Sequence, residues 1–443
     1  MEIVTLLWQY WMTMRLQKKW ATRSQLEAWQ EQQVQKLLRT ILSRSPFYQE
    51  RFGDLLPDAW RELAPIDKQL MMENFSSLNT LGIHKEDAFQ VAFQAEDSRD
   101  FTPQIGKVTV GLSSGTSGNR GIFLVGPQER ARWAGMILAK ALPGQLWSEH
   151  RIAFFLRANS NLYTSVNRRR IRFSFFDLLH PISEHIQRLN EFFPTVLVAP
   201  PSMLRLLAEA KQRGELRVSP AKIISVAEVL DPLDEAFIRQ VFHQNIHQIY
   251  QCTEGFLAVT CAHGTLHVNE DILVMEKEYL DEQKERFYPI LTDFSRTSQP
   301  IIRYRLNDIL TEKKTACPCG SLFTALEKIE GRADDVFLFR HENQPQKRWV
   351  SVFPDFIRRA LLRTSEDIQE YKVKQMNPQL LEVSIQAEGK EELLYEQVRS
   401  RLQEAISQHG AQVPMIQFTP YERVSGGKKM RRVERMFTQS EIE

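Results

Sequence analysis

The sequence of 443 residues has only four cysteines, and its formal net charge at pH 7 is just +2. So few cysteines exclude the disulfide framework of a small secreted protein and favour a reducing, cytoplasmic setting. The nearly balanced charge argues against a dedicated nucleic-acid binder. With 42% hydrophobic and 25% charged residues, the composition is that of a globular protein, and the length predicts more than one hydrophobic core.

The chain also lacks an apolar run long enough to cross a bilayer, for which about 20 residues are needed. Its charge-poor run from Ile3 to Met14 is shorter, and no small-residue cleavage site follows. We therefore expect neither a transmembrane segment nor a signal peptide. This region either forms a helix packed on its own domain or lies at a membrane surface. The membrane alternative is suggested by the aromatic residues Trp8, Tyr10, Trp11 and Trp20.

The pattern of apolar residues predicts an α/β protein. One long helix is expected over 23–52, beginning at a Ser24 cap, because apolar side chains recur there at helical spacing. From about residue 107, short apolar strands alternate with helices, which indicates a largely parallel, helix-covered sheet. Residues 265–312 have shorter strands joined by polar turns, as in a small antiparallel subdomain. Residues 350–443 form another compact α/β pattern.

A domain boundary is predicted near 333–336, at the sequence GRADDVF. It divides the chain into an N-terminal domain, residues 1–333, and a C-terminal domain, residues 334–443. The strands expected before the boundary are 107–112, 151–156, 195–200, 221–230 and 245–252, and the helices are 128–142, 202–214 and 232–242. After it we expect helices near 353–363 and 390–408 and strands at 380–386 and 414–419.

One stretch, VGLSSGTSGNRGIFLVG at 110–126, concentrates five glycines and four serines or threonines. Its GLSSG matches the nucleophile elbow of α/β-hydrolases, but that elbow needs a helix directly after the serine, and a strand-like segment follows here. The Gly-Lys-Ser/Thr ending of the ATPase phosphate loop is absent. Two hypotheses remain: a mobile surface loop, or a loop whose N–H groups, hydroxyls and Arg120 surround a polyphosphate.

Four further motifs follow this loop in order: YQCTEG at 250–255, IIRYRLND at 301–308, EGRADD at 330–335 and SGGKKMRR at 425–432. Together the five resemble the signature of the acyl-adenylate-forming superfamily, which contains acyl-CoA synthetases, aryl-acid ligases and adenylation domains. PIIRYRLNDI, CPCG, GRADD and SPFYQERF are most similar to phenylacetate–CoA ligases and the related deazaflavin-cofactor synthetases. Two residues depart from the superfamily pattern, since Ala227 replaces the usual glycine and Arg120 the usual lysine.

The resemblance implies a reaction and an architecture. ATP would activate a carboxylic acid to an acyl-adenylate with release of pyrophosphate, and the acyl group would pass to a thiol, either of CoA or of the phosphopantetheine of an acyl carrier protein. The N-terminal domain would hold ATP and the acid, and a small mobile C-terminal domain would carry the catalytic lysine. A mixture of small residues with Phe154, Phe155 and Tyr163 suggests an aryl or medium-sized apolar acid.

The resemblance also implies roles for single residues around ATP. The β- and γ-phosphates would be held by the loop residues Ser113, Ser114, Gly115, Thr116, Ser117, Gly118 and Arg120. Adenine would lie between Tyr250 and the strand at Ala227 and Glu228. The ribose would contact Asp308 and Arg332.

Four more residues would take part in the reaction or in the domain movement that accompanies it. Thr253 would bind the α-phosphate, and Glu254 would bind Mg²⁺, a hard cation that prefers oxygen ligands. Lys428 would bridge the substrate carboxylate and the α-phosphate, and its neighbour Lys429 is the rival for this role. Asp334 would be the hinge about which the C-terminal domain turns.

Three cysteines and one histidine suggest a second metal site. Cys261, His267, Cys317 and Cys319 make a Cys₃His set, the ligand type of closed structural zinc sites, and some phenylacetate–CoA ligase-like proteins carry a similar set. His263 is an alternative ligand, and unligated thiols are the competing interpretation. Cys252 lies inside the nucleotide motif and is expected to be packing.

Other functions stay open. The enzyme could adenylylate a cofactor, as deazaflavin-cofactor synthetases do, or the chain could be a non-catalytic nucleotide-binding homologue. The basic run NRRRIRF at 167–173 is either solvated surface or a contact for CoA phosphates or an acidic carrier helix. A hydrolase is disfavoured by the sequence after the serine elbow.

Overall fold

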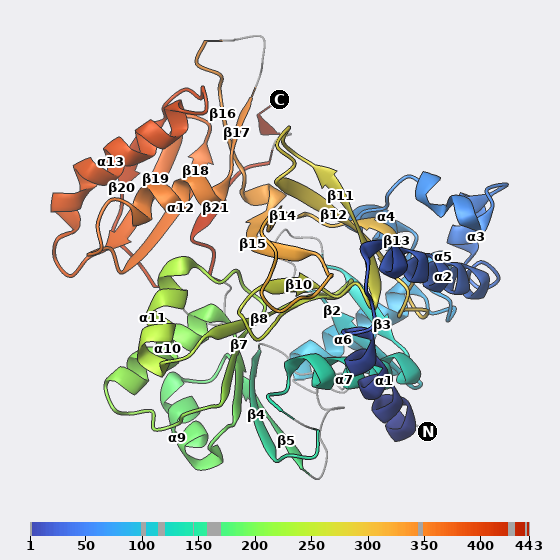
Figure 1. The fold of residues 1–443 in the computed structure, drawn as a ribbon. Coiled ribbons are helices and arrows are strands. Elements are labelled where there is room, and N and C mark those ends of the chain that lie inside the picture. Colours follow the sequence, from blue (N-terminus) through green and yellow to red (C-terminus); the bar gives the residue numbers. More distant parts are fainter. Residues whose placement is uncertain are drawn as a thin grey trace. The chain divides into compact units, whose positions relative to one another are not determined.

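A computed structural model describes residues 2–98, 103–113, 120–144, 146–156, 170–343, 349–423, 430–438 and 441–442. The chain forms two compact units (Figure 1). Unit 1 consists of Met1–Leu230, Glu235–Leu306 and Thr311–Lys328, and unit 2 of Asp231–Asp234, Asn307–Leu310 and Ile329–Glu443. Both units combine helices with sheets, so the predicted α/β class is confirmed. No helix in the described part of the chain is long and apolar enough to cross a membrane.

Unit 1 begins with short helices. They are α1 (Glu2–Leu16), α2 (Arg23–Ile41), α3 (Pro46–Phe52), the 3₁₀ turn η1 (Pro57–Glu62), α4 (Lys68–Glu73), α5 (Phe75–Leu78) and α6 (Lys85–Ser98). The single helix predicted over 23–52 is wrong, because α2 ends at Ile41 and Pro46 starts a new helix. Proline lacks the N–H that would continue the first helix. The cap of α2 is Thr22, whose side chain accepts a hydrogen bond from the Gln25 N–H, and not Ser24.

Three antiparallel strands surround the glycine-rich stretch. They are β1 (Gln104–Ile105), β2 (Val108–Leu112) and β3 (Ile122–Val125), in the order β1-β2-β3. The pairing of Leu112 with Ile122 places the intervening loop between the ends of adjacent strands.

The larger sheet of twelve strands starts with a parallel part. Its strands are β4 (His150–Leu156), β5 (Ile171–Asp177), β6 (Val196–Ala199), β7 (Lys222–Ser225) and β8 (Ile246–Cys252), in the spatial order β5-β4-β6-β7-β8. The strands predicted here are confirmed, although the one expected at 221–230 already ends at Ser225. Strand β5 was not predicted, because its first residues belong to the basic run NRRRIRF. The helices of this part are α7 (Pro127–Ala141), α9 (Ile182–Phe192), α10 (Pro201–Gln212) and α11 (Pro232–Phe242).

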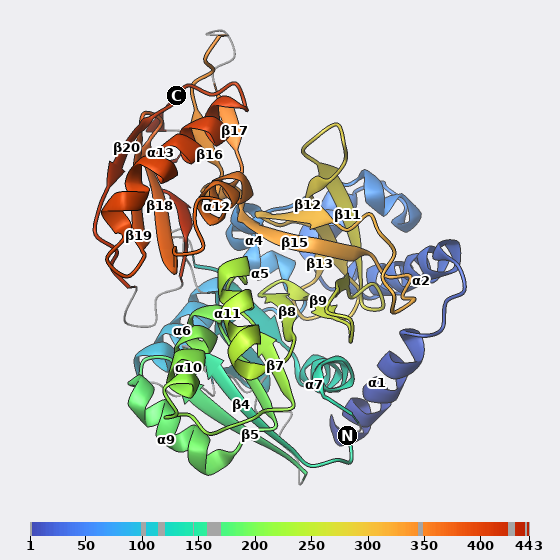
Figure 2. The same cartoon turned by 60° about the vertical axis from the view of Figure 1, so that its left-hand side comes forward.

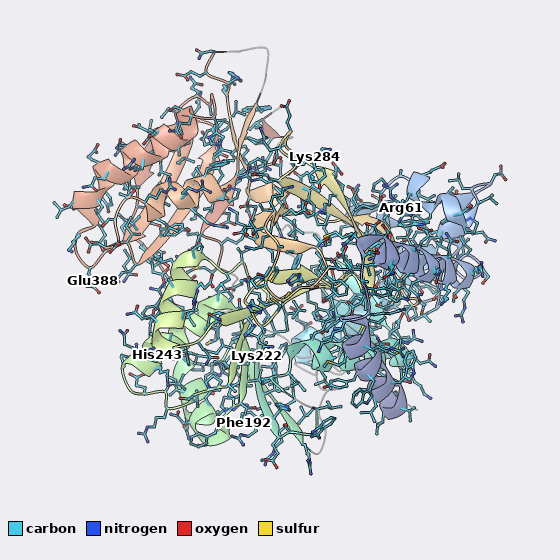
Figure 3. The ribbon with its side chains drawn as sticks, in the orientation of Figure 1. Arg61, Phe192, Lys222, His243, Lys284 and Glu388 are labelled. Carbon is cyan, nitrogen blue, oxygen red and sulfur yellow. The ribbon has the colours of Figure 1, made fainter. Side chains whose placement is uncertain are left out.

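Alternation along β4 explains how helices come to cover both faces of this part. Ala153 and Phe155 belong to one buried cluster, which includes α9 and α10, and Ile152 and Phe154 belong to another, which includes α1 and α7 (Figure 2). Successive strand residues point to opposite faces. Lys222, which begins β7 and is labelled in Figure 3, donates a 2.8 Å hydrogen bond from Nζ to the carbonyl of Ala141 at the end of α7.

The sheet continues in antiparallel strands after β8. These are β9 (Gly255–Thr260), β10 (Leu266–Val268), β11 (Leu273–Tyr279), β12 (Arg286–Asp293), β13 (Ile301–Arg305), β14 (Asp308–Glu312) and β15 (Ala325–Arg332). The spatial order is β11-β12-β14-β15-β10-β9-β8, with β13 paired to β12. The antiparallel strands predicted within 265–312 are confirmed, and they belong to the same sheet as the parallel strands. The hairpin between β8 and β9 joins them to the parallel part.

Unit 2 has its own core. A four-stranded sheet in the order β20-β19-β18-β21 carries α12 (Pro354–Leu362) and α13 (Glu391–Ser407). The strands are β18 (Glu370–Asn377), β19 (Leu380–Gln386), β20 (Met415–Phe418) and β21 (Val433–Arg435), and the turn η2 (Ala333–Asp335) and the hairpin of β16 (Phe337–Phe339) with β17 (Val350–Val352) precede them. The two predicted helices and two predicted strands are confirmed.

Candidate active site

The turn between β8 and β9 holds Thr253 and Glu254 at the place where the sheet changes from parallel to antiparallel. Glu254 is only 7% exposed. The Thr253 hydroxyl donates to its Oε2 over 2.9 Å, and the Tyr304 hydroxyl donates to its Oε1 over 2.9 Å. Burial and the neighbouring Glu254 raise the pKa of Tyr304, which keeps the phenol protonated. The Glu254 carboxylate is therefore held in one orientation by two hydroxyl donors.

Gly255, the residue after this turn, leaves little room for a side chain. A Cβ at this position would lie 3.0 Å from Oδ2 of Asp293 and 3.3 Å from Leu257. Asp293 accepts hydrogen bonds from the N–H and hydroxyl of Ser295, and burial raises its pKa to about 6. A second buried carboxyl group thus lies directly behind the turn.

Arg296 connects the turn to the strand after the glycine-rich loop. Its guanidinium donates to the carbonyl of Thr253 over 2.5 Å and to the carbonyl of Leu124 on β3 over 3.5 Å. No local sequence pattern marks Arg296 for this role, because it lies in a polar turn between β12 and β13. Arg296 thus links the Thr253–Glu254 turn to β3, although the two are far apart in the sequence.

The base of the glycine-rich loop is closed by reciprocal hydrogen bonds. The N–H of Ser113 donates to the carbonyl of Gly121, and the N–H of Gly121 donates to Oγ of Ser113, each over 2.7 Å. Nζ of Lys68, at the start of α4, donates to the same Oγ over 3.3 Å. Sequence reasoning missed Lys68. The predicted phosphate contacts Ser114, Gly115, Thr116, Ser117 and Gly118 lie outside the described residues.

Arg120, expected to supply charge to the loop, contacts α6. It forms an ion pair with Glu96, with one N–O distance of 3.0 Å, and lies 5.8 Å from the ring centre of Phe93. The hydrogen bond to Glu96 raises the pKa of Arg120. Its positive charge is thus already balanced by an acidic partner.

The residues expected near adenine lie on neighbouring strands. Tyr250 is buried in β8, next to β7, and Ala227 and Glu228 follow the end of β7. Ala227 has φ of +67°, a conformation that a Cβ disfavours and glycine adopts freely. Oε2 of Glu228 accepts a 3.3 Å hydrogen bond from the N–H of Ser202.

Unit 2 brings together the predicted ribose and hinge residues. Asp308 is the first residue of β14, Arg332 is the last of β15, and Asp334 follows in η2. The side chain of Asn307 donates to Oδ2 of Asp334 over 2.8 Å, and its carbonyl accepts from the N–H of Ala333 over 2.9 Å. Two motifs separated in sequence are therefore joined beside these residues.

Lys428 lies outside the described residues, but the residues that follow it are firmly anchored. Arg431 forms ion pairs with Asp335 and, over 2.8 Å, with Glu434. Nε of Arg435 donates to the carbonyl of Asp334 over 3.1 Å. The end of the Gly-Lys motif is thus attached to η2 within unit 2.

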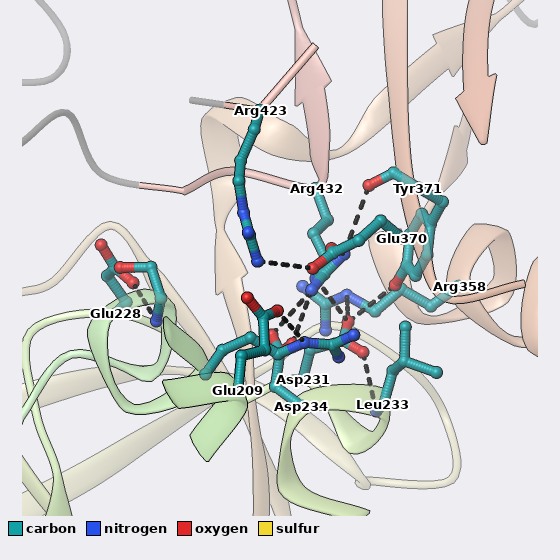
Figure 4. Close-up of polar contacts among 12 residues, drawn as sticks. Glu209, Glu228, Asp231, Leu233, Asp234, Arg358, Glu370, Tyr371, Arg423 and Arg432 are labelled. Atoms are coloured by element: carbon teal, nitrogen blue, oxygen red, sulfur yellow. Dashed lines mark hydrogen bonds and ion pairs between the residues drawn. The ribbon is translucent and has the colours of Figure 1, made fainter. Parts of the chain in front are cut away.

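Arg432 is the centre of a buried ionic cluster, shown in Figure 4. It donates two hydrogen bonds to Asp234, of 2.7 and 2.8 Å, and one of 2.6 Å to Glu370. Asp231 lies 4.0 Å from Nε of Arg432 and accepts a 2.7 Å hydrogen bond from the hydroxyl of Tyr371. One guanidinium therefore faces three buried carboxylates, an arrangement that sequence reasoning missed.

The predicted Cys₃His residues are brought together in unit 1. The ligand atoms of Cys261, His267, Cys317 and Cys319 all lie within 4.8 Å of one another. His267 is oriented by a 3.0 Å contact between Nδ1 and the carbonyl of Phe323, which leaves Nε2 facing Cys319 at 3.4 Å. The alternative ligand His263 is not part of this group and is exposed.

Two similar turns present the thiols. The carbonyl of Cys261 accepts from the N–H of Gly264, and the carbonyl of Cys317 accepts from the N–H of Gly320. Both glycines have positive φ, which lets the chain turn back sharply after each cysteine. Cys252 forms no disulfide, is half-buried and lies outside this group.

The aromatic residues expected near the acid are placed only in part. Phe155 is completely buried in a core cluster and stacks on Phe176 with ring centres 4.6 Å apart. Phe154 is buried in the cluster on the other face of β4. Tyr163 lies outside the described residues. Phe155 is thus a core residue.

Comparison with known proteins identifies the class of this fold. No family model matches the chain. The chain has the fold of adenylate-forming acid–CoA ligases, and the resemblance drawn from the five motifs is confirmed.

Two enzymes of known structure and one relative by sequence are similar to this chain. A structure of 2-hydroxyisobutyryl-CoA ligase with an acyl-AMP has a TM-score of 0.68 at 15% identity, covering 95% of this chain and 91% of that one, and the same enzyme has been solved with 2-HIB-AMP and CoA. The anthranilate CoA ligase with anthranoyl-AMP has a TM-score of 0.51 at 13% identity, covering 72% and 65%. A phenylacetate-coenzyme A ligase of Thermus thermophilus is 26% identical over 205 residues, 42% of this chain and 43% of that relative. The match thus spans less than half of the relative.

Proposed function

We propose that this protein is an ATP-dependent acid–thiol ligase. In the first reaction, a carboxylate oxygen attacks the α-phosphorus of ATP, and the bond to the β-phosphate breaks with release of pyrophosphate. In the second, a thiol sulfur attacks the acyl carbon, the thiol proton passes to water, and AMP leaves with the electrons of the acyl–oxygen bond. The observation that carries this proposal is the buried Thr253–Glu254 turn, fixed by Tyr304, within a fold shared with acyl-AMP-bound ligases.

The phosphates and the nucleoside would be held by the residues that the motifs assign. The loop from Ser113 to Arg120 and the ammonium group of Lys68 would hold the β- and γ-phosphates, and Thr253 would donate to the α-phosphate. Tyr250, Ala227 and Glu228 would border adenine. Asp308 and Arg332 would bind the ribose. Preorganised donors of this kind stabilise the charge that moves onto pyrophosphate.

Glu254 fits the role of a Mg²⁺ ligand. Its carboxylate is a hard oxygen donor, it is buried, and each oxygen keeps a lone pair after accepting one hydroxyl bond. When bound, Mg²⁺ would neutralise phosphate charge. The protein's own part is to hold the carboxylate in one orientation through Thr253 and Tyr304.

Lys428 would bridge the carboxylate and the α-phosphate in the first reaction. Residues 1–333 would form the adenylation domain and residues 334–443 the domain that carries this lysine, with Asp334 as the hinge. The anchoring of Arg431 and Arg432 next to the lysine segment supports this assignment. A firm attachment on one side would limit the positions that Lys428 can take.

CoA is the favoured acceptor, because a structural neighbour was solved with CoA. A carrier-protein phosphopantetheine presents the same thiol and is the alternative. We propose an aryl or medium-sized apolar acid as the substrate, supported by the partial likeness to a phenylacetate-coenzyme A ligase. The four cysteines, none of which forms a disulfide, fit a reducing, cytoplasmic location.

We also propose that Cys261, His267, Cys317 and Cys319 hold a structural zinc ion. Three thiols and one imidazole within 4.8 Å form a closed four-ligand set with no position left for a substrate. Such a site would join the turn after β9, β10 and the turn before β15.

The test is carboxylate-dependent exchange of pyrophosphate into ATP over a panel of aryl and fatty acids. Exchange should occur with one class of acid, and Lys428→Ala should lower it by about 10²–10³-fold. Lys429→Ala is the matched control, because it removes an adjacent lysine, and it should retain most of the exchange. Near-normal exchange in Lys428→Ala would contradict the role of this lysine.

A different outcome would point to another function. ATP binding without exchange for any acid would favour adenylyl transfer to a cofactor or a non-catalytic role. AMP found covalently attached to a product, with pyrophosphate released, would identify the adenylyl transfer.

A further inference from the structure

Helix α1 is apolar on two faces, and only one of them is buried. Leu6 and Tyr10 pack into the cluster that also contains residues of α7. The opposite face exposes Ile3, Val4, Leu7, Trp8, Trp11 and Met14. Val4 is 70% exposed, Trp8 58% and Trp11 57%. The spacing of these residues follows the helical repeat, so they form one stripe.

The stripe continues onto a neighbouring segment. Trp147, in the turn between α7 and β4, is 51% exposed, and its ring centre lies 6.2 Å from that of Trp11. Single exposed apolar residues are common, whereas a continuous patch of this kind marks an interaction surface. We refer to the six residues of the stripe together with Trp147 as the α1 patch.

The orientation of α1 is fixed by close packing against α7. A Cβ on Gly135 would lie only 2.4 Å from the carbonyl oxygen of Leu6 and 2.9 Å from Cβ of Gln9. The two helices therefore approach each other at a position that only glycine permits. Figures 1 and 2 show α1 beside α7 at the margin of unit 1. The exposed stripe is a consequence of this packing.

Positive charges border the α1 patch. Arg15, Lys18 and Lys19 lie at and just after the end of α1 and are exposed or half-buried. On the other side, a guanidinium N–H of Arg170 donates to the carbonyl of Trp147 over 2.7 Å. Glu2 is the only acidic residue among the first 22, and it is paired with Arg130. The segments that border the patch thus carry Arg15, Lys18, Lys19 and Arg170, against a single exposed acidic residue beside Trp147, Glu149.

We propose that the α1 patch docks the protein on an anionic bilayer surface. The apolar side chains would enter the headgroup region, where tryptophan is especially favourable, and the cations would contact anionic lipid headgroups. A second copy of the chain is a poorer occupant, because self-association would bring the cationic borders together. This proposal is independent of the proposed catalytic function.

The experiment is sedimentation of the full chain with vesicles. Vesicles of phosphatidylcholine alone are compared with vesicles in which phosphatidylglycerol replaces part of it. The protein should bind the anionic vesicles, with a blue shift of tryptophan fluorescence, and added salt should weaken the binding. The variant Trp8→Ala/Trp11→Ala should bind about tenfold more weakly or worse, since it removes two interfacial anchors.

Leu393→Ala/Met415→Ala is the matched control, because both side chains are large, apolar and at least 70% exposed in unit 2. It should bind vesicles like the wild type, and circular dichroism should show that both variants are folded. Absence of binding to anionic vesicles, or equal binding by the tryptophan variant, would overturn the proposal. So would a wild-type dimer in light scattering that the tryptophan variant converts to a monomer, since the patch would then be a subunit interface.

Discussion

The hydroxyl of Tyr304 lies 2.9 Å from Oε1 of Glu254 and donates a hydrogen bond to it, although 50 residues separate the two in sequence. Both side chains are buried. Burial raises the pKa of the tyrosine, so it acts as a donor throughout the physiological range. The phenol therefore positions the carboxylate that we propose as the Mg²⁺ ligand.

Tyr304→Phe should weaken the binding of Mg²⁺ at Glu254. Loss of the donor frees Glu254 to reorient, so we expect a higher Mg²⁺ concentration for half-maximal exchange. The rate should fall about tenfold or more, in line with about 1.5–3 kcal/mol for one hydrogen bond to a charged group. Tyr279→Phe is the control, because Tyr279 donates to Glu312 over 3.3 Å at an exposed place. An unchanged Mg²⁺ dependence in Tyr304→Phe would refute the positioning role.

The contributions of Lys68 and Arg120 to phosphate binding should differ. Lys68 donates to Ser113 at the base of the loop, whereas Arg120 is paired with Glu96. Lys68→Ala should therefore raise the KM for ATP by about tenfold or more, the effect of one charge-assisted contact. Arg120→Ala should raise it less. The KM is measured from pyrophosphate exchange at varied ATP concentrations. A larger increase of KM in Arg120→Ala than in Lys68→Ala would assign the phosphate contact to the arginine.

These two predictions show what the sequence could and could not reveal about the site. Thr253 and Glu254 are neighbours in one motif, so the resemblance to the superfamily was enough to propose them. Tyr304 lies within the motif IIRYRLND, but that motif did not indicate its contact with Glu254, and Lys68 and Arg296 lie outside all five motifs. Their roles depend on long-range packing, for which a single sequence carries no local signal.

The fold was predictable to a similar extent. Strands β4, β6, β7 and β8 and their helices have strong apolar periodicity, so their existence followed from the sequence. The joining of the antiparallel strands to β8 depends on pairings across the sheet, and those were not predictable. The break before Pro46, in contrast, had a signal in the proline itself that the long helical pattern concealed.

Arg432 should be essential for the stability of unit 2. Its removal would break the short hydrogen bonds to Asp234 and Glu370 inside the cluster, and breaking a buried ion pair costs about 3–5 kcal/mol. Urea unfolding of Arg432→Met should show this loss. Arg401→Met is the control, because its ion pair with Glu404 is exposed and is worth about 0.5 kcal/mol or less. Equal stability of the two variants would mean that the buried cluster contributes little.

His185 should make the protein less stable in mild acid. It is fully buried and contacts the rings of Phe155 and Phe176. Burial lowers its pKa, with nearby Arg188 and His180 adding to the effect. The unfolded chain therefore binds a proton more readily, and this contribution to stability is complete above about pH 6.5 and is lost as the pH falls towards the folded-state pKa.

The measurement is urea unfolding at about pH 7.5 and about pH 5.5, on the two sides of the ordinary histidine pKa. His185→Phe keeps an aromatic ring and cannot titrate, so its stability should fall less with acid than that of the wild type. His84→Gln is the control, since His84 is exposed and is not among the groups that shift the pKa of His185. An identical acid dependence in His185→Phe and the wild type would show that other groups govern the effect.

Cys261, His267, Cys317 and Cys319 should together bind one zinc ion per chain. Elemental analysis of the purified chain should find stoichiometric zinc, because the four ligand atoms already lie within 4.8 Å and a closed thiolate-rich site binds this ion tightly. Cys261→Ser/Cys317→Ser should lose the metal and melt at a lower temperature, and a strong chelator should lower the melting temperature of the wild type in the same way. Cys252→Ser, which alters a thiol outside the cluster, should keep its zinc. A metal-free protein whose melting temperature a chelator leaves unchanged would mean that the four residues pack together without a metal.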